Sequence, residues 1–273
     1  MKRNPERILL VNWAGSKFRR LNWILPVLCS IPHRRFVDVC CGGGSVLLNK
    51  PQVEEEVMND ADPDIANFFQ VLADDELFEQ FFDRVTLLPV SRRLYHKHLL
   101  MWRERILTDR VKQAVVWFSI ASQSFGGTFG DSWGFSRTNP NPRLRRLRML
   151  LPAHQRLAGV QVTCMDMVDV VRQFDSLDTL FYVDPPYLER QGSHKYTVEA
   201  SEADHQRLVE ALNQVRGSFV LTGFEHPVYD GLRDCQKHST ELVVLAGRTR
   251  LNRLTSLKEY RRQEWMWIHS NQG

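Results

Sequence analysis

The sequence has no apolar run of about 20 residues, the length that a membrane-spanning helix requires. Its first residues are basic, but the apolar stretch behind them is short and no small-residue cleavage site follows. Hydrophobic residues make up 43% of the chain and charged residues 25%, as in globular proteins. We therefore expect a cytoplasmic protein that does not associate with a membrane.

The cysteines form no C-x-x-C pair and no Cys/His spacing typical of a zinc site. They are Cys29, Cys40, Cys41, Cys164 and Cys235. An odd, scattered set predicts reduced thiols in a reducing compartment. The sequence thus predicts no metal site.

Two common nucleotide-binding loops are also missing. No G-x-G-x-x-G follows a predicted strand, which argues against a nicotinamide-dependent oxidoreductase. No G-x-x-x-x-G-K-[ST] loop is present, which argues against ATP.

The net charge of +4 is small, but the basic residues are clustered. Residues 142–156 contain five arginines and no acidic residue, and 247–262 contain six Lys/Arg residues and one glutamate. Such clusters favour binding to a polyanion, including nucleic acid. A solvated helix face is the alternative for either cluster.

Apolar and β-branched runs predict strands that alternate with helices at both ends of the chain. We expect strands at 34–40, 55–60, 160–164, 180–183, 218–222, 240–246 and 264–269. This alternation predicts an α/β sheet.

The helical patterns are densest in the middle of the chain. We expect helices at 16–29, 63–75, 111–123, 142–156 and 201–217, with helical structure from 76 to 124 and a loop or hairpin at 124–142. Ser201 with Asp204 predicts the start of the last helix, and Gly217 predicts its end. We expect residues 1–75 and 152–273 to form one discontinuous domain, with 76–151 inserted into it.

The stretch FVDVCCGGGSV, residues 36–46, leads a predicted strand into three glycines before a helix. Bare glycine backbone lets a ligand approach closely. Asp60 ends the next predicted strand, where an acidic residue can accept both hydroxyls of a ribose. Together they favour a nucleoside-containing cofactor, although a glycine turn alone is usually only a tight turn.

The stretch TLFYVDPPYLER, residues 179–190, ends an apolar strand with Asp184, two prolines and Tyr187. Because proline fixes its own φ and restricts the residue before it, this exit from the strand is stiff and extended. Ligands bind at the carboxyl ends of strands in open α/β sheets. Carboxylate and carbonyl acceptors beside an aromatic ring suit a planar group that carries an exocyclic amine.

Four stretches in this order resemble DNA adenine-N6 methyltransferases of the Dam type, as found in phages and prophages. They are NWAGSK (12–17), the glycine loop, MNDADPDI (58–65) and FYVDPPY (181–187), and DHQRL (204–208) and EWMWIHSN (264–271) also match. The resemblance implies a Rossmann-like sheet that binds S-adenosylmethionine and a mostly helical target-recognition insert. It also implies a monomer that acts on double-stranded DNA, alone or within a restriction-modification system.

The resemblance further implies a set of cofactor-binding residues: Trp13, Lys17, Asp38, Gly42, Gly44, Asp60, Asp166 and Asp184. Trp13 has core packing as an alternative role, Lys17 a place on a helix surface, and Asp166 a helix cap. Cys40 stands where relatives usually have an aromatic residue, and we interpret it as a small buried hydrophobe.

The resemblance assigns catalysis to the stretch Asp184, Pro185, Pro186 and Tyr187. The two amine hydrogens of an adenine would bond to the Asp184 carboxylate and the Pro185 carbonyl, which directs the nitrogen lone pair toward the methyl donor. Alignment of this kind contributes several kcal/mol to catalysis, on the order found for other oriented reactants. The base has to leave the duplex to be reached, and it would stack on Tyr187.

We expect the insert to recognise DNA through an aromatic loop near Phe125 and Phe135 and through arginines that contact phosphates. The expected DNA-binding residues are Asn12, Phe129, Trp133, Arg137, Arg143, Arg145 and Arg146. Packing inside the insert is the alternative for each aromatic. Asn12 replaces a lysine of GATC-type relatives, so the sequence names no target site.

Three other functions remain open at this point. Cytosine N4 carries an amine that the same acceptors would bind, and adenine in RNA is a further substrate. A DNA-binding protein without catalysis is an alternative of another class, which the intact Asp60, Asp184 and Tyr187 argue against.

Overall fold

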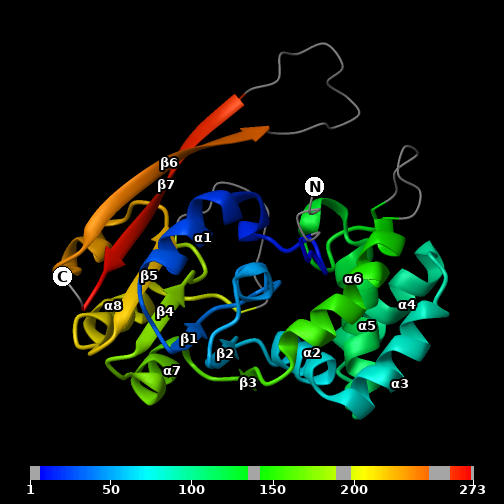
Figure 1. The fold of residues 1–273 in the computed structure, drawn as a ribbon. Coiled ribbons are helices and arrows are strands. Elements are labelled where there is room, and N and C mark those ends of the chain that lie inside the picture. Colours follow the sequence, from blue (N-terminus) through cyan, green and yellow to red (C-terminus); the bar gives the residue numbers. More distant parts are fainter. Residues whose placement is uncertain (1–6, 135–141, 189–197, 246–258, 272–273) are drawn as a thin grey trace, which may run out of the picture.

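The computed structural model describes residues 7–134, 142–188, 198–245 and 259–271. Its strands are β1 (Arg35–Asp38), β2 (Glu55–Asn59), β3 (Gln161–Thr163), β4 (Thr179–Val183), β5 (Ser218–Gly223), β6 (Gln236–Leu245) and β7 (Glu259–His269). They form one sheet in the order β3-β2-β1-β4-β5-β7-β6. Strands β1 to β5 are parallel, and β7 is antiparallel between β5 and β6 (Figure 1). This order confirms the predicted Rossmann-like sheet.

The helices lie around this sheet and beyond its β3 edge (Figure 1). They are α1 (Leu21–Ser30), α2 (Pro63–Ala73), α3 (Asp75–Thr86), α4 (Arg92–Arg103), α5 (Arg110–Gln123), α6 (Pro142–Leu157), α7 (Met167–Phe174) and α8 (Glu202–Leu212). Short 3-10 helices are η1 (Lys17–Arg20), η2 (Leu47–Asn49), η3 (Phe125–Gly127) and η4 (Pro227–Gly231). Helices α2 to α6 gather on one side of the molecule.

Strand β4 is buried on both faces, and its residues alternate between two hydrophobic clusters. Leu180 and Tyr182 face the cluster that includes α1 and α2, whereas Phe181 and Val183 face the cluster that includes α7 and α8. A parallel strand covered on both faces needs such a continuous apolar run. The composition of 180–183 therefore places β4 at the centre of the sheet.

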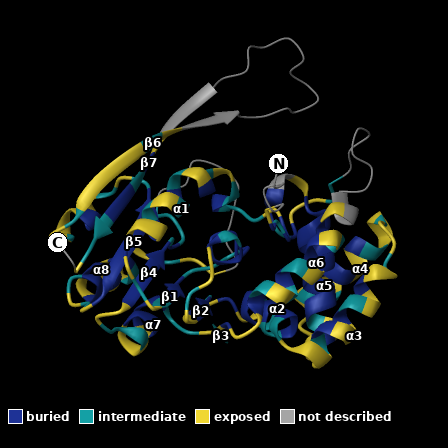
Figure 2. Ribbon diagram, viewed as in Figure 1, coloured by how far each residue is buried: buried dark blue, intermediate teal, exposed yellow. Residues whose placement is uncertain are grey.

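The first of these clusters continues from the sheet into the helical region. Phe68 of α2 packs on Trp117 of α5 with ring centroids 4.7 Å apart, and both belong to the cluster that contains Phe36 of β1. Figure 2 shows buried residues running through both regions. The predicted insert 76–151 thus shares a core with the sheet, and α6 runs across residue 151.

Side-chain caps explain where most helices begin. Asp62, Asp74, Ser91 and Asp109 each accept a backbone N–H in the first turn of α2, α3, α4 and α5. Ser201 and Asp204 form the capping box at the start of α8, as the sequence predicts.

Two predictions about elements are wrong. Helix α8 ends at Leu212 and not at Gly217, which lies directly before β5. A Cβ at Gly217 would lie 2.4 Å from the Thr179 carbonyl oxygen, so close approach of two strand starts requires the glycine. Helix α7 was not predicted, although Met167, Val168, Val170 and Val171 follow a helical period and are buried.

Asn59, at the end of β2, joins three neighbouring strand ends. Its amide nitrogen donates to the carbonyls of Val39 and Met165, and its oxygen accepts from the Thr163 hydroxyl and the Met165 N–H. The side chain is buried. These bonds fix the edge of the sheet where Asp60 and Asp38 lie.

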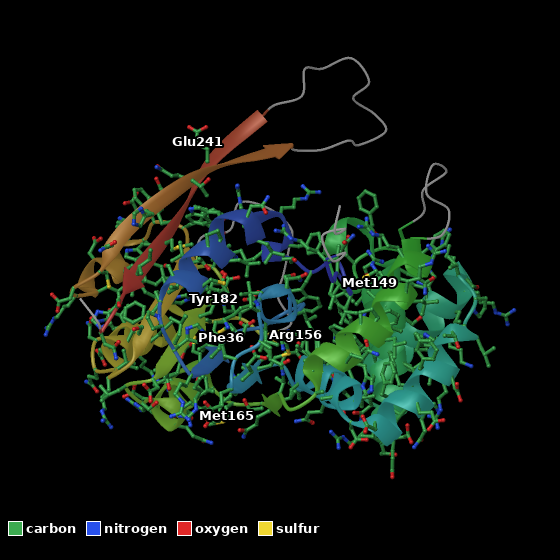
Figure 3. The ribbon with its side chains drawn as sticks, viewed as in Figure 1. Phe36, Met149, Arg156, Met165, Tyr182 and Glu241 are labelled. Carbon is green, nitrogen blue, oxygen red and sulfur yellow. The ribbon has the colours of Figure 1, made fainter. Side chains whose placement is uncertain are left out.

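A buried ion pair connects the sheet to α6. Arg156 of α6 donates to both carboxylate oxygens of Glu56 on β2, at 2.5 and 2.9 Å. Figure 3 shows Arg156 between the sheet and the helical region. Replacing one partner would leave the other charge buried and unpaired.

No helix in the described part of the chain is both long and apolar enough to cross a bilayer.

We expect Asn59→Ala to lower the free energy of unfolding by about 2–4 kcal/mol, because several buried polar groups lose their partner. Urea denaturation followed by circular dichroism measures this. The control is Asn67→Ala on α2, whose bonds to Arg110 are exposed and whose loss should cost about 1 kcal/mol or less. Equal destabilisation by the two variants would contradict the role of Asn59.

Candidate active site

The site lies at the point where the order of the strands in the sheet reverses. From β1 the next strands, β2 and β3, lie on one side, whereas from β4 the next strand, β5, lies on the other side. Asp38 ends β1 and Asp184 follows β4, so both carboxyl groups lie at the carboxyl edge of the sheet. In open α/β sheets this switch point is where ligands bind.

A cavity opens at this edge, and acidic residues dominate its charged lining. Its acidic residues are Asp38, Asp60, Asp62, Asp166, Asp184, Glu199 and Asp204. Among the described lining residues, Lys17 is the one basic side chain. An acidic cavity attracts a cation and repels phosphate groups, which agrees with the missing phosphate-binding loops.

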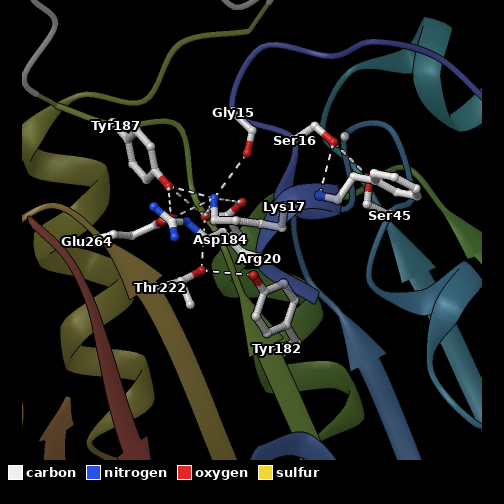
Figure 4. Close-up of polar contacts among 12 residues, drawn as sticks. Gly15, Ser16, Lys17, Arg20, Ser45, Tyr182, Asp184, Tyr187, Thr222 and Glu264 are labelled. Atoms are coloured by element: carbon white, nitrogen blue, oxygen red, sulfur yellow. Dashed lines mark hydrogen bonds and ion pairs between the residues drawn. The ribbon is translucent and has the colours of Figure 1, made fainter. Parts of the chain in front are cut away.

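Lys17 and Asp184 form an ion pair in the cavity (Figure 4). The Lys17 ammonium lies 2.6 and 2.5 Å from the two oxygens of Asp184, and 3.1 Å from the Gly15 carbonyl. Lys17 is only 4% exposed, so the alternative of a surface lysine is wrong. Lys17 of the stretch NWAGSK therefore contacts Asp184 of DPPY directly.

Tyr187 takes part in the same network. Its hydroxyl lies 2.6 Å from the Lys17 ammonium, and its ring lies under that ammonium at 4.9 Å. Phe224 packs beside the ring, with centroids 4.6 Å apart. The ring is thereby held between Lys17 and Phe224.

Two further residues, neither of them predicted from the sequence, contact this network. Thr222 of β5 donates to Asp184 at 3.0 Å and is bonded to the Tyr182 hydroxyl. Glu264 of β7 accepts from the Tyr187 hydroxyl at 3.2 Å. EWMWIHSN contributed to the resemblance, but a glutamate in a strand carries no signal of its own.

The ionisation of Asp184 reflects two opposing effects. Burial raises the pKa of Asp184, and the Lys17 ammonium opposes that rise through its charge and hydrogen bonds. Lys17 thus stabilises the carboxylate form, which accepts hydrogen bonds and donates none.

His205 fixes the backbone of the second proline. Its Nε2 lies 2.9 Å from the Pro186 carbonyl oxygen, and its Nδ1 lies 2.8 Å from the Tyr229 hydroxyl. Because a carbonyl only accepts, Nε2 carries the proton and Nδ1 accepts from Tyr229. Burial lowers the pKa of His205, which favours this neutral form. The match at DHQRL therefore has a structural explanation.

Asp60 organises the glycine loop. Its carboxylate accepts the backbone N–H of Gly42 at 2.8 Å and that of Asp62 at 2.9 Å. Burial raises the pKa of Asp60 to about 6. The predicted ribose-binding residue thus lines the cavity and also shapes the loop beside it.

Gly42 and Gly44 are required by conformation and space. Both have positive φ, 51° and 70°. A Cβ on Gly42 would lie 2.9 Å from Cδ1 of Trp13, and one on Gly44 would lie 2.7 Å from Cζ of Phe69. Gly42 therefore faces the cavity wall, whereas Gly44 packs on α2.

Asp38 has a buried carboxylate oxygen, Oδ1, without a hydrogen-bond partner in the described structure. Burial, followed by the nearby charge of Asp184, raises the pKa of Asp38 to about 8. A buried polar atom without a partner is uncommon and costly. Asp38 also lines the cavity.

Asp166 lines the cavity and also caps α7, where it accepts the Val168 N–H at 2.9 Å. The capping role that the sequence left open is therefore present. Asp166 is also 3.3 Å from the exposed Arg207.

The loop after α5 lies against Trp13 in the wall of the cavity. Phe129 packs on Trp13 and Trp117, with ring centroids 5.9 and 5.8 Å apart. Asn12 is exposed, and its carbonyl oxygen is 3.4 Å from where a Cβ on Gly127 would be. The structure thus brings Asn12 and the loop together.

The loop aromatics differ in exposure. Phe129 and Trp133 are half-buried, and Trp133 bonds to Gln123. Phe125 is 62% exposed. Packing, the alternative role, therefore applies to the first two, and among the described aromatics of this loop Phe125 is the exposed one, whereas Phe135 lies outside the described residues.

Arg146 was predicted to contact DNA phosphate, but its side chain is buried. Arg146 is 8% exposed and donates to the Ser122 carbonyl inside the protein. Burial lowers the pKa of Arg146 to about 10. Arg145 is exposed on α6. Arg137 and the side chain of Arg143 lie outside the described residues.

Within the described ranges, no group of three or more His, Cys, Asp or Glu side chains is arranged to hold a metal ion.

The fold is thus a Rossmann-like sheet with an acidic cavity at its switch point, and Asp184 and Pro186 of D-P-P-Y line that cavity. The model of the D12 class N6 adenine-specific DNA methyltransferase family matches residues 13–229. The chain belongs to this family, and it is an S-adenosylmethionine-dependent enzyme that methylates adenine in DNA.

Two solved structures are similar over nearly the whole chain. A putative methyltransferase, yhhF, from Escherichia coli is 10% identical with a TM-score of 0.36, covering 92% of this chain and 83% of its own. The rRNA methyltransferase aviRa from Streptomyces viridochromogenes is 14% identical with a TM-score of 0.39, covering 95% and 87%. A search of curated proteins found no match.

We expect Asp38→Asn to change how stability depends on pH. The folded-state pKa of Asp38 is about 8, above its ordinary 3.8. The stability that this group contributes is present at low pH and is lost as pH rises through 8. Because asparagine mimics the protonated form, the variant should gain stability relative to the unmodified protein by up to about 1.4 kcal/mol per pH unit.

Urea denaturation at pH 5, 6, 7 and 8 measures this difference. Asp178→Asn, before β4 at the opposite edge of the sheet, is the control. Parallel stability curves for Asp38→Asn and the unmodified protein would contradict a raised pKa at Asp38.

Proposed function

We propose that this enzyme methylates N6 of an adenine that has left the DNA duplex, with Asp184, Pro185, Pro186 and Tyr187 forming the catalytic site. The observation that carries this proposal is the largely buried Asp184 carboxylate after β4, 15% exposed, beside an aromatic ring and open to the acidic cavity. The finer resemblance to Dam-type enzymes of phages belongs to the same proposal.

The cavity fits S-adenosylmethionine by its charge and by the unsatisfied atom of Asp38. This cofactor carries a sulfonium and an ammonium group, and when bound it supplies the methyl group in activated form. Asp38 would accept hydrogen bonds from the ammonium, and Asp60 would accept the ribose hydroxyls. Trp13, Gly42 and Asp166 would form the remaining walls.

Asp184 and the Pro185 carbonyl would accept the two hydrogens of the adenine amine. This amine is a weak nucleophile because its lone pair is delocalised into the ring. Two acceptors on one side favour a pyramidal nitrogen and direct its lone pair away from them. His205 already bonds to the Pro186 carbonyl, and so fixes the chain that presents these acceptors.

Tyr187 would provide the surface on which the base stacks. Its hydroxyl is held by Lys17 and Glu264, so its ring orientation is set before a base arrives. The methylated nitrogen carries a positive charge and is acidic, so it releases its proton readily. The acceptor carboxylate stabilises that charge while it exists.

Residues near the loop after α5 would contact the DNA. Phe125 is exposed and its backbone N–H bonds to the Ser132 carbonyl at 2.8 Å, so the ring is presented by a folded loop. An aromatic in this setting fills the space that an extruded base leaves. Asn12 and Arg145 lie exposed for contact with DNA.

We expect Asp184→Ala to lower methyl transfer at least about a thousandfold, because the acceptor that orients the amine is lost. DNA binding should be retained. The assay incubates DNA with labelled S-adenosylmethionine, digests it to nucleosides and separates N6-methyladenine from N4-methylcytosine. Comparable activity in the variant would overturn the mechanism, and N4-methylcytosine as the product would overturn the substrate.

We expect Phe125→Ala to lower the rate of methylation roughly tenfold while the unfolding midpoint stays unchanged, since the ring is exposed. A fluorescent base analogue at the target position reports extrusion directly. The matched control is Leu177→Ala, which is 59% exposed at the opposite edge of the sheet. Equal rates for both variants would exclude Phe125 from base extrusion.

A further inference from the structure

We propose that Glu264 is a positioning residue that holds Lys17 when the substrate amine bonds to Asp184. This inference rests on the proposed role of Asp184. Glu264 belongs to β7, outside the stretches to which the cofactor and catalysis were assigned. The juxtaposition of a second buried carboxylate with the Lys17 ammonium carries the inference.

Glu264 lies at the carboxyl edge of β5 because β7 is antiparallel to it. Gly223, the last residue of β5, pairs with Trp265, and Glu264 precedes Trp265 by one position on β7. Its neighbour Gln263 is exposed and bonds to Ser239, whereas Glu264 is buried. Alternation along the strand therefore turns Glu264 toward the site.

The Glu264 carboxylate contacts three partners of this network (Figure 4). Oε1 lies 3.5 Å from the Lys17 ammonium and 3.2 Å from the Tyr187 hydroxyl. Oε2 lies 3.3 Å from Nε of Arg20. The side chain of Glu264 is 3% exposed.

The charges of this cluster balance. Lys17 and Arg20 are cations, and Asp184 and Glu264 are carboxylates. Without Glu264 the cluster would carry an additional positive charge beside a site that binds a sulfonium and forms a positive nitrogen. Unlike charges at this distance in a buried site interact strongly.

Competition for Asp184 explains why a second partner is needed. Lys17 now lies against both Asp184 oxygens, and Thr222 donates to one of them. A carboxylate offers about four acceptor positions. When the amine takes one of them, the Lys17 ammonium has to stay buried near another negative group, since an unpaired buried charge is costly. Glu264 is already within ion-pair distance.

The test compares Glu264→Gln, which keeps the shape and removes the charge, with Glu264→Asp, which keeps the charge and shortens the side chain. We expect Glu264→Gln to lower kcat roughly 10- to 100-fold, with dissociation constants for DNA and S-adenosylmethionine changed less than about threefold. Glu264→Asp should retain more kcat than Glu264→Gln. A role in packing alone predicts the reverse order.

Gln263→Ala, one residue away on the exposed face of β7, is the matched control, and its kcat should equal that of the unmodified enzyme. Full kcat in Glu264→Gln, or a lower kcat in Glu264→Asp than in Glu264→Gln, overturns the inference. If Glu264→Gln does not fold, Arg20→Gln is tested instead, because Arg20 is more exposed and contacts Glu264. An unchanged kcat in Arg20→Gln would then overturn the inference.

The Asp184→Ala assay separates this inference from the proposed function. Activity in Asp184→Ala overturns both. Loss of activity in Asp184→Ala together with full kcat in Glu264→Gln overturns the role of Glu264 alone.

Discussion

The buried ion pair between Lys17 and Asp184 is the interaction on which the site depends. It joins the segment before α1 to the end of β4, two parts of the chain 167 residues apart in sequence. Burial raises the pKa of Asp184, and the Lys17 ammonium opposes this rise and stabilises the carboxylate. Thr222, Tyr187 and Glu264 then complete a network in which each donor has an acceptor. Asp184 is therefore both an ionised acceptor and a side chain with a fixed direction.

The other residues at this edge of the sheet surround the ion pair with an acidic surface, which repels phosphate groups. Asp60 binds the backbone of the glycine loop, Asn59 joins the ends of neighbouring strands, and Asp38 keeps one oxygen without a partner. An acidic wall with little conformational freedom suits a cationic cofactor, and it agrees with the family to which the chain belongs. The aromatic contact of Trp13 with Phe129 connects this wall to the loop after α5.

Much of this arrangement could be predicted from local pattern. Apolar strands, glycines and the D-P-P-Y exit have sequence signals because strand burial and proline stereochemistry are local constraints. Arg146 could not be predicted, since a basic cluster does not reveal which arginine turns inward. Gly217 was misread as a helix end because close approach of two strands leaves the same signal, a glycine. Helix α7 does show a helical period of apolar residues, so it could have been predicted.

The sequence by itself determined the α/β class, the order of the strand-forming segments and the chemical groups at their ends, because side-chain types and spacing fix local conformation. The tertiary structure decided which of these groups meet. Thr222 on β5 contacts Asp184, and Glu264 on β7 contacts Lys17, the ion-pair partner of Asp184, because an antiparallel last strand enters the sheet beside β5. That convergence depends on strand order and register, which arise from packing of the whole chain and leave no mark on any single segment.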